Sequence, residues 1–406
     1  MIKNSRSPKK ENLHPFFEWG IKITKAENIY LYDDKGNKYI DLTSSANVVN
    51  IGYDHPKIRK VINSQIKKLI FAPPWCRTEE AEALANKLIS LFPKQLDTVL
   101  RVTTGSEAVE VAMKLARKYT KKTRFLSFEH SYHGHTLGSM SIGMNTKTKK
   151  DFLPLIASDI IIHPYIKGGN KGYAEESLKT LSVIEKKFKT NKYAAFVTET
   201  MATSAGHYTL ERDFLKKLRN LCDKYNVLLI IDEVLTGFGR TGKMFSFEKF
   251  GIIPDIVCLA KGFGSGYAPI GATVTNHKIA DGFNYFSTFS WNPLACAVSS
   301  VVLDIYEEEK IVENSEKLGE YAIKKLSKKL DTFKSVKDIR GRGLIIAIEF
   351  YDSNKFAKVQ EFCVKKGLFL GSMDLPNILS ITPPLVINQK QLDTALDIII
   401  DAITND

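Results

Sequence analysis

The sequence predicts an α/β protein in which a large domain around a mostly parallel sheet is joined to a smaller α+β domain. The apolar runs 227–231 and 256–260 show no alternation of polar and apolar residues, which is typical of parallel strands buried on both faces. Segments with helical spacing of apolar residues separate such runs, and this alternation indicates a sheet covered by helices. A helix-rich pattern replaces it beyond Phe289. We therefore expect three segments, 1–45, 46–290 and 291–406.

Residues 1–45 are expected to complete the smaller domain and to contribute to an interface. A polar tail leads into an aromatic segment at 14–19. The short apolar segments 29–32 and 39–41 flank the turn-forming residues 33–36, a pattern that predicts a β-hairpin.

Residues 46–290 are expected to form the large domain. Apolar residues recur with helical spacing over 57–70 and 79–92. The predicted strands are 99–102, 124–128, 160–163, 194–199, 227–232, 256–260 and 270–275, and the predicted helices among them are 107–119 and 211–225. Parallel strands end at one edge of a sheet, where α/β proteins bind their ligands, so the residues that follow these strands are the site candidates.

Residues 291–406 are expected to form the α+β domain. Its predicted helices occupy 293–334, 355–366 and 389–404, and its strands lie within 336–350 and at 378–381. The boundary to the large domain is placed where the parallel-strand pattern ends.

Composition excludes several classes of protein. Of the 406 residues, 44% are hydrophobic and 25% are charged, as in ordinary soluble proteins. The formal charge of +13 comes from cations spread along helical segments, not gathered with aromatic residues, so we expect no nucleic-acid partner. No run of ~18 uncharged apolar residues occurs, which excludes a membrane span. Five cysteines without CxxC spacing, and no signal-peptide pattern, predict a cytoplasmic protein with reduced thiols.

Three candidate groups fall at the predicted sheet edge. Lys261 follows an apolar strand, and a lysine taken out of water has a lowered pKa and can form a Schiff base. Asp232 ends the preceding strand and could hold a protonated ring nitrogen. Gly105 and Ser106 open a helix, whose N-terminus attracts phosphate. Pyridoxal phosphate combines an aldehyde, a pyridine nitrogen and a phosphate. Each signal alone is common, because most lysines are surface residues and most serines at helix starts are only caps.

Seven sequence blocks resemble those of class III, or omega, aminotransferases, which are fold type I pyridoxal-phosphate enzymes. They are TTGSEAVEVAMKLAR, SYHGHT, IDEVLTGFGRTG, PDIVCLAKGFGSGYAPIGA, STFSWNPLACA, IRGRGL and TPPLVI, in the order and spacing of that family. The resemblance covers about 29–399. It implies a seven-stranded central sheet, pyridoxal 5'-phosphate as cofactor, and ping-pong transfer of an amino group from an amine donor to an oxo-acid acceptor.

The resemblance also implies catalytic residues. Lys261 is similar to the family lysine that binds the cofactor covalently and moves the proton. Asp232 is similar to the aspartate that holds the pyridine nitrogen. Glu199 matches the family glutamate at the end of the strand before the cofactor.

Further cofactor contacts follow from the same resemblance. Gly105 and Ser106 resemble the phosphate cradle, Tyr132 and Val234 resemble the residues on the two faces of the ring, and His133 belongs to the Tyr-His-Gly element. Thr288 is similar to a threonine that reaches the phosphate of the neighbouring subunit. The resemblance thus implies an obligate homodimer with shared active sites and leaves open whether two dimers associate.

No metal site is expected. His130, His133 and His135 lie close together in the sequence, but they lack a fourth ligand, and the resemblance implies a Tyr-His-Gly element without metal.

Two positions depart from the family pattern. Ser380 stands where many members that recognise α-carboxylates and 2-oxoglutarate have an arginine, and Ser204 stands where they have the glutamate that pairs with it. Loss of both is coherent, since either charge alone would be uncompensated. We therefore expect an ω-amino acid, diamine or simple amine as donor, and pyruvate favoured over 2-oxoglutarate as acceptor. The expected pocket wall comprises Phe16, Phe17, Asn47, Tyr53 and Trp75, and the candidate replacement cations are Arg77, Arg101 and Lys243.

Two other functions stay open. An amino acid racemase, epimerase or aminomutase would use the same lysine and aspartate but would need no oxo acid. A non-catalytic pyridoxal-phosphate-binding regulator is disfavoured, because no DNA-binding module accompanies the intact cofactor motifs.

Overall fold

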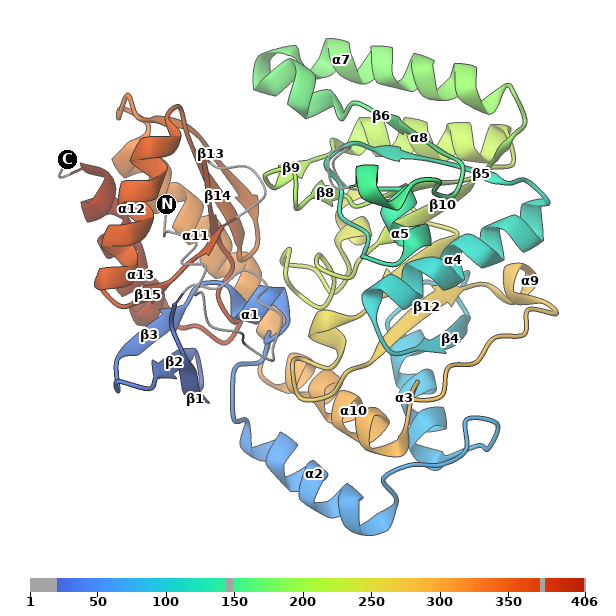
Figure 1. Cartoon of the computed structure of the whole chain (residues 1–406), viewed down its shortest axis with the longest axis horizontal. Coiled ribbons are helices and arrows are strands. Elements are labelled where there is room, and N and C mark those ends of the chain that lie inside the picture. The colour runs from blue at the N-terminus through green and yellow to red at the C-terminus, as the bar shows by residue number, and fades with distance from the viewer. Residues whose placement is uncertain (1–19, 144–148, 373–376, 405–406) are drawn as a thin grey trace.

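A seven-stranded sheet forms the centre of the structure, a computed structural model that describes residues 20–143, 149–372 and 377–404, except the side chains of 166–171 and 372 (Figure 1). Its strands, in spatial order, are β4 (Thr98–Val102), β12 (Gly271–Thr275), β11 (Ile256–Leu259), β10 (Leu228–Asp232), β7 (Tyr193–Thr198), β5 (Arg124–Phe128) and β6 (Ser158–Ile161). Only β12 runs against the others, because it pairs antiparallel with β11 and β4. The predicted mostly parallel sheet is confirmed.

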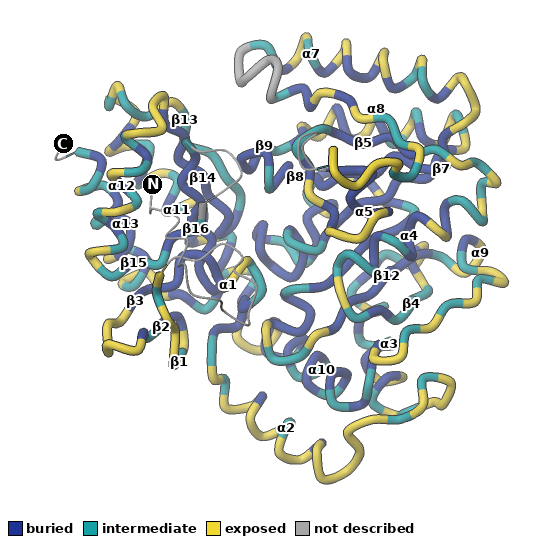
Figure 2. Tube along the Cα trace, viewed as in Figure 1, coloured by how far each residue is buried: buried dark blue, intermediate teal, exposed yellow. Residues whose placement is uncertain are grey.

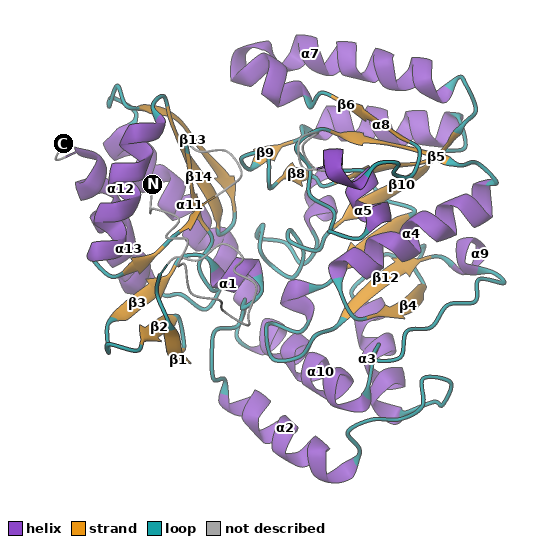
Figure 3. Cartoon of the chain, in the orientation of Figure 1, coloured by secondary structure: helices purple, strands orange, loops and turns teal. Residues whose placement is uncertain are grey.

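Helices cover both faces of this sheet. Neighbouring residues of a strand point to opposite faces, and in the central strands both sets are apolar, so both faces have to be buried. Ile230 packs into the apolar cluster that contains the buried face of α4 (Gly105–Thr120). Leu229 and Ile231 pack into the larger cluster on the opposite face. That cluster includes buried residues of α3 (Glu79–Ser90), α8 (Arg212–Lys224) and α10 (Pro293–Glu308). Figure 3 shows the resulting α/β layers.

The long helix α7 (Pro164–Phe188) was not predicted. It begins at the cap residue His163, whose Nδ1 accepts a hydrogen bond of 3.2 Å from the Tyr165 N–H, and Pro164 occupies its first turn. Ile184 and Phe188 anchor its C-terminal part in the core. The remaining elements of this part are α2 (Pro56–Lys68), α5 (Leu137–Ser141), α9 (His277–Ala280), the hairpin β8 (Met201–Ala202) and β9 (Tyr208–Thr209), and 3₁₀ turns at Lys150–Phe152, Ser246–Phe250 and Lys261–Phe263.

The smaller part joins the two ends of the chain, as predicted. β13 (Val336–Arg342), β14 (Ile345–Phe350), β17 (Ile378–Ile381) and β16 (Gly371–Ser372) form an antiparallel sheet. A second sheet has the order β1 (Ile23–Glu27), β2 (Tyr30–Asp33), β3 (Lys38–Asp41) and β15 (Leu368–Phe369), so that the N-terminal hairpin pairs with a C-terminal strand. The accompanying helices are α11 (Ile311–Leu330), α12 (Ser353–Lys365) and α13 (Gln389–Thr404).

Burial follows these layers. Figure 2 shows buried chain at the sheets and exposed chain along α2. Helix α10 packs against α2 and α3 beside the large sheet, although it lies in the 291–406 segment. The boundaries at 45/46 and 290/291 stay predictions. Within the described ranges, no helix is long and apolar enough to cross a bilayer.

Candidate active site

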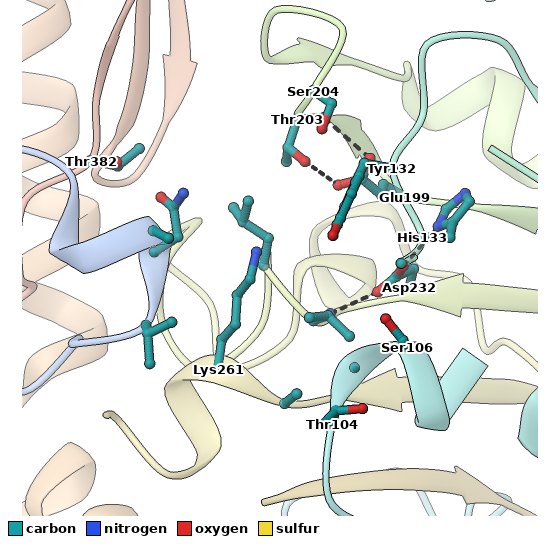
Figure 4. Close-up of a pocket in the computed structure, with 18 of the residues that line it drawn as sticks. Thr104, Ser106, Tyr132, His133, Glu199, Thr203, Ser204, Asp232, Lys261 and Thr382 are labelled. Carbon is teal, nitrogen blue, oxygen red and sulfur yellow. Dashed lines mark hydrogen bonds and ion pairs between the residues drawn. The ribbon is translucent and has the colours of Figure 1, made fainter. Parts of the chain in front are cut away.

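The carboxyl ends of five parallel strands open onto one cavity of about 1240 Å³. Residues that follow β4, β5, β7, β10 and β11 line its floor, and residues of the smaller part line the opposite side. Figure 4 shows Lys261 pointing into this space, with Asp232 and Glu199 on the large-sheet side and Thr382 across from them. Lys261, Asp232 and Glu199, each predicted at the end of a strand, therefore lie around the same cavity.

Lys261 follows β11 directly and opens a short 3₁₀ turn with a left-handed backbone, φ +46°. Burial lowers the pKa of its ammonium, although the carboxylates of Asp232 and Glu199 oppose that shift. The ammonium makes no hydrogen bond or ion pair with any residue that the structure describes. A half-buried amine with a lowered pKa is a competent nucleophile.

Asp232 ends β10 and is held from two sides. Its Oδ2 lies 2.7 Å from Nδ1 of His133, and its Oδ1 accepts a hydrogen bond of 2.9 Å from the Val234 N–H. Both Asp232 and His133 are buried. The His133 contact fixes the orientation of the carboxylate, which is a positioning role that the sequence did not reveal.

Glu199 follows β7 and is buried at the same edge. Burial raises the pKa of its carboxyl to about 7, and the neighbouring Asp232 adds to the rise. The Thr203 hydroxyl donates a hydrogen bond to it, and the Thr203 N–H does so at 3.3 Å. Glu199 can therefore carry a proton near neutral pH, as a group positioned for proton exchange would.

The start of α4 is built to receive an anion. Thr104 is its N-cap, with a hydroxyl that accepts a hydrogen bond of 3.2 Å from the Glu107 N–H. Gly105 and Ser106 therefore lie in the first turn, where backbone N–H groups have no intrahelical partner. A side chain at Gly105 is excluded, because its Cβ would lie 2.8 Å from Val234 Cγ1. This refines the expected Gly-Ser cradle, since the capping residue is Thr104 and not Ser106.

Tyr132, His133 and Val234 line the cavity together with this cradle, whereas Thr288 does not. Thr288 is exposed, on a segment that also exposes Phe286 and Phe289. A residue that acts on the site of a neighbouring subunit has to be exposed in the single chain. The role of Thr288 at the phosphate of a neighbouring subunit stays a prediction.

Ser204 and Ser380 both line the cavity, on the β8–β9 hairpin side and on β17. His207 lies with them, and its Nε2 shares a hydrogen bond of 2.9 Å with Ser380 Oγ. None of the candidate cations is near: the cavity lining contains neither Arg77, Arg101 nor Lys243.

Of the expected pocket wall, Asn47 lines the cavity, whereas Tyr53 and Trp75 do not. Trp75 is 80% exposed. Phe16 and Phe17 lie outside the described residues.

The N-terminal wall is a left-handed turn labelled α1 (Ser44–Asn47) in Figure 1. All four residues have φ between 45° and 63°, and none is glycine. Such a run costs about 1 kcal/mol or more per residue, so the surrounding contacts have to hold it. No sequence pattern indicates it, because the residues are Ser, Ser, Ala and Asn.

The lining residues fit pyridoxal phosphate. The free N–H groups of α4 suit its phosphate, the Asp232 carboxylate suits a protonated ring nitrogen, and the amine of Lys261 suits its aldehyde. Groups of three or more side chains able to hold a metal ion are absent from the part of the chain that the structure describes.

Comparisons with known proteins agree with this geometry. The sequence pattern of the family Aminotransferase class-III matches residues 13–403. An acetylornithine aminotransferase from Methanopyrus kandleri is 33% identical, with 97% of each chain covered. An ornithine aminotransferase from Oceanobacillus iheyensis is 34% identical, with 97% of this chain and 96% of the relative covered.

Solved structures share the whole architecture. An amine transaminase from an uncultivated Pseudomonas species, in its PLP-bound form, superposes with a TM-score of 0.91 at 26% identity, over 99% of this chain and 100% of the other. The chain belongs to the class III aminotransferases, enzymes that use pyridoxal phosphate to pass an amino group from an amine to an oxo acid.

Proposed function

We propose that Lys261, Asp232 and Glu199 carry the catalysis of this aminotransferase. When bound, pyridoxal phosphate accepts the amino group and withdraws electrons from the reacting carbon. Lys261 is the covalent anchor and the base that moves the proton at that carbon, supported by its lowered pKa and its position at the cavity centre. Asp232, oriented by His133, holds the ring nitrogen.

The remaining cofactor contacts belong to the same proposal. Gly105 and Ser106 hold the phosphate at the start of α4, while Tyr132 and Val234 lie on the two faces of the ring. Glu199 exchanges a proton near neutral pH, because burial and the neighbouring Asp232 carboxylate raise the pKa of its carboxyl to about 7.

The donor we propose is an ω-amino acid, diamine or simple amine, with pyruvate used in preference to 2-oxoglutarate. The single observation behind this is that the cavity lining, within the described residues, contains no arginine. 2-Oxoglutarate has one carboxylate more than pyruvate, and the extra carboxylate needs a cation of its own. Bidentate recognition by arginine is the usual way to supply that cation.

Assembly as a homodimer and a place in the cytoplasm complete the proposal. The exposed Thr288 and its apolar neighbours support the dimer. The five free cysteines, four of them buried, support a reducing compartment.

A donor panel tests the substrate proposal. Simple amines, diamines, ω-amino acids, ornithine and acetylornithine are each combined with pyruvate or 2-oxoglutarate, and product is followed together with the absorbance of the bound cofactor. Ornithine and acetylornithine are included because relatives carry those names. Preferential use of 2-oxoglutarate would contradict the proposal. Turnover of a chiral amino acid without any oxo acid would favour a racemase.

Lys261→Ala tests the catalytic assignment. We expect it to abolish turnover and to shift the absorbance of the bound cofactor, since only an amine can form the covalent link. Lys278→Ala, an exposed lysine on α9, is the control and is expected to behave as wild type. Full turnover in the Lys261→Ala protein would overturn the assignment.

A further inference from the structure

Three uncharged polar side chains line the cavity from two directions, the β8–β9 loop and strand β17 of the smaller part (Figure 4). Ser380 is on β17, and Ser204 and His207 lie in the loop that joins β8 to β9. All three line the cavity. Their hydroxyl groups and imidazole can donate and accept hydrogen bonds within the cavity without carrying a formal charge.

His207 is the central residue of this group. It is buried, and its backbone is left-handed, φ +60°. Nε2 bonds to Ser380, whereas the buried Nδ1 has no hydrogen bond of regular geometry among the described residues, and the neighbouring Thr203 backbone favours its protonation.

The imidazole is neutral in this setting. Burial lowers the pKa of His207 to about 3, and the cations Arg340 and Arg240 contribute to the shift. The subsite therefore offers hydrogen bonds but no positive charge of its own.

The two nearby guanidinium groups bond mainly to other protein groups, although Nη2 of Arg340 and Nε of Arg240 are buried without a partner among the described residues. Nη1 of Arg340 lies 2.8 Å from the Asp338 carboxylate and 2.7 Å from that of Glu349. Arg240 is fully buried and bonds to Ser44, Asn50 and two carbonyl oxygens. Neither lines the cavity.

We propose that Ser204, His207 and Ser380 form a specificity-determining subsite for an uncharged hydrogen-bonding group of the substrate, an amide or a hydroxyl, and that they select against a carboxylate. The inference rests on the proposed function and narrows it, because among the proposed donors it favours amines with an uncharged distal group over ω-amino acids. An amide or hydroxyl exchanges hydrogen bonds with these side chains, while a carboxylate would be taken out of water with no arginine in the described cavity lining to pair with it.

The test compares donors that differ only at the distal group. β-Alaninamide, aminopropanol and β-alanine form one set, and the corresponding four-carbon amide, alcohol and acid form a second. We expect kcat/KM for the amide or alcohol to exceed that for the acid by about tenfold or more in wild type. The result expected for Ser380→Ala is a loss of about fivefold to tenfold for the uncharged donors, mainly in KM, with little change for the acid.

His207 variants separate hydrogen bonding from packing. His207→Gln can still reach Ser380 and is expected to stay close to wild type, whereas His207→Leu is expected to lose the uncharged donors. Both replacements carry the same left-handed backbone, so their difference reports the hydrogen bond. Ser90→Ala, at an exposed position of α3, is the control.

A gain of function adds a second arm, since Ser380→Arg is expected to raise the use of the acid relative to the amide. Thermal unfolding confirms that each variant is folded. A wild-type preference for the acid, or an equal loss of acid and amide in Ser380→Ala, overturns the subsite.

Failure of the proposed function looks different, because then no donor of either kind transfers its amino group. Binding of propanamide and propanoate to the holoenzyme, followed by ligand-observed NMR, still decides the matter in that case. Preferential binding of the amide that Ser380→Ala removes supports the subsite, and preferential binding of propanoate overturns it.

Discussion

Two adjacent carboxyl groups at the end of β10 show how one residue step decides a function. Asp232 faces the cavity, where His133 holds it. Glu233 points away into the protein, where Ser246 Oγ donates to it at 2.6 Å and the Phe247 N–H at 3.0 Å. The sequence predicted a site at Asp232 from its place at a strand end. No sequence pattern assigns a role to Glu233, because two of the partners of that carboxyl come from a 3₁₀ turn more than ten residues away, in addition to the Thr236 hydroxyl at 2.6 Å.

The pH dependence of stability is the first consequence at this scale. Burial raises the pKa of Glu233 to about 7. Stability from a carboxyl with a raised pKa is complete below its unfolded-state pKa, about 4.3, and is lost as pH rises through the folded-state value. We expect Glu233→Gln to lose less free energy of unfolding than wild type between about pH 5 and 8, by on the order of 2 kcal/mol.

Chemical denaturation at several pH values measures this difference. Glu320→Gln, at an exposed position of α11, is the control and is expected to follow wild type. The Glu233→Gln variant keeps part of the pH dependence of stability, because the pKa of Glu199 is also raised to about 7. Identical pH profiles for Glu233→Gln and wild type would contradict the raised pKa.

At the scale of elements, the left-handed turn α1 is held by two buried charged groups. The Asp41 carboxylate accepts hydrogen bonds from the Thr43 N–H at 2.8 Å and the Ser45 N–H at 3.0 Å. Arg240 donates to Ser44 Oγ at 2.9 Å. The turn lines the cavity, whereas Asp41 and Arg240 do not. These two groups therefore maintain the substrate wall from behind, through their hydrogen bonds to the turn.

Arg240→Gln is therefore expected to affect both stability and substrate binding. It removes the donors to Asn50 Oδ1, Leu344 O and Pro383 O as well as to Ser44, and leaves buried acceptors unpaired. We expect a loss of about 3–5 kcal/mol in the free energy of unfolding and a several-fold rise in KM. Denaturant unfolding and steady-state kinetics measure the two effects.

The control for Arg240→Gln is an arginine outside the buried network around α1. Arg342→Gln changes a cation on β13 that lies over the Phe250 ring. It is expected to cost less than 1 kcal/mol and to leave KM unchanged. An equally mild effect of Arg240→Gln would show that α1 does not depend on it.

Elements differ in how far the sequence predicts them. The strands β5 and β17 were predicted at their observed bounds, because short apolar runs in a buried sheet have few alternatives. The reversed direction of β12 was not predicted, since a strand pattern carries no direction. The pairing of β3 with β15 joins residues about 330 positions apart, and α1 has no glycine to mark it. Such features depend on tertiary contacts.

At the scale of the whole molecule, exposed apolar residues of two segments mark a candidate surface for the proposed homodimer. Phe71 and Phe289 form an edge-to-face pair with ring centroids 5.4 Å apart, and both are exposed. Leu69, Ile70, Trp75 and Phe286 are exposed as well. An apolar patch of this kind is typical of a protein interface. Thr288 lies within it, while Lys261 lies in the cavity of the same chain.

Mixed dimers test whether these two residues serve the same site across the interface. Lys261→Ala and Thr288→Asp chains are each expected to be nearly inactive alone, because the first lacks the amine and the second places a carboxylate against the cofactor phosphate. In a mixed dimer one site has Lys261 from one chain and Thr288 from the other, so co-expression with random pairing is expected to restore about a quarter of wild-type activity, and mixed dimers purified through two affinity tags about half. Thr288→Ser is the control that keeps the hydroxyl. Without restoration in purified mixed dimers, Thr288 would not act across the interface.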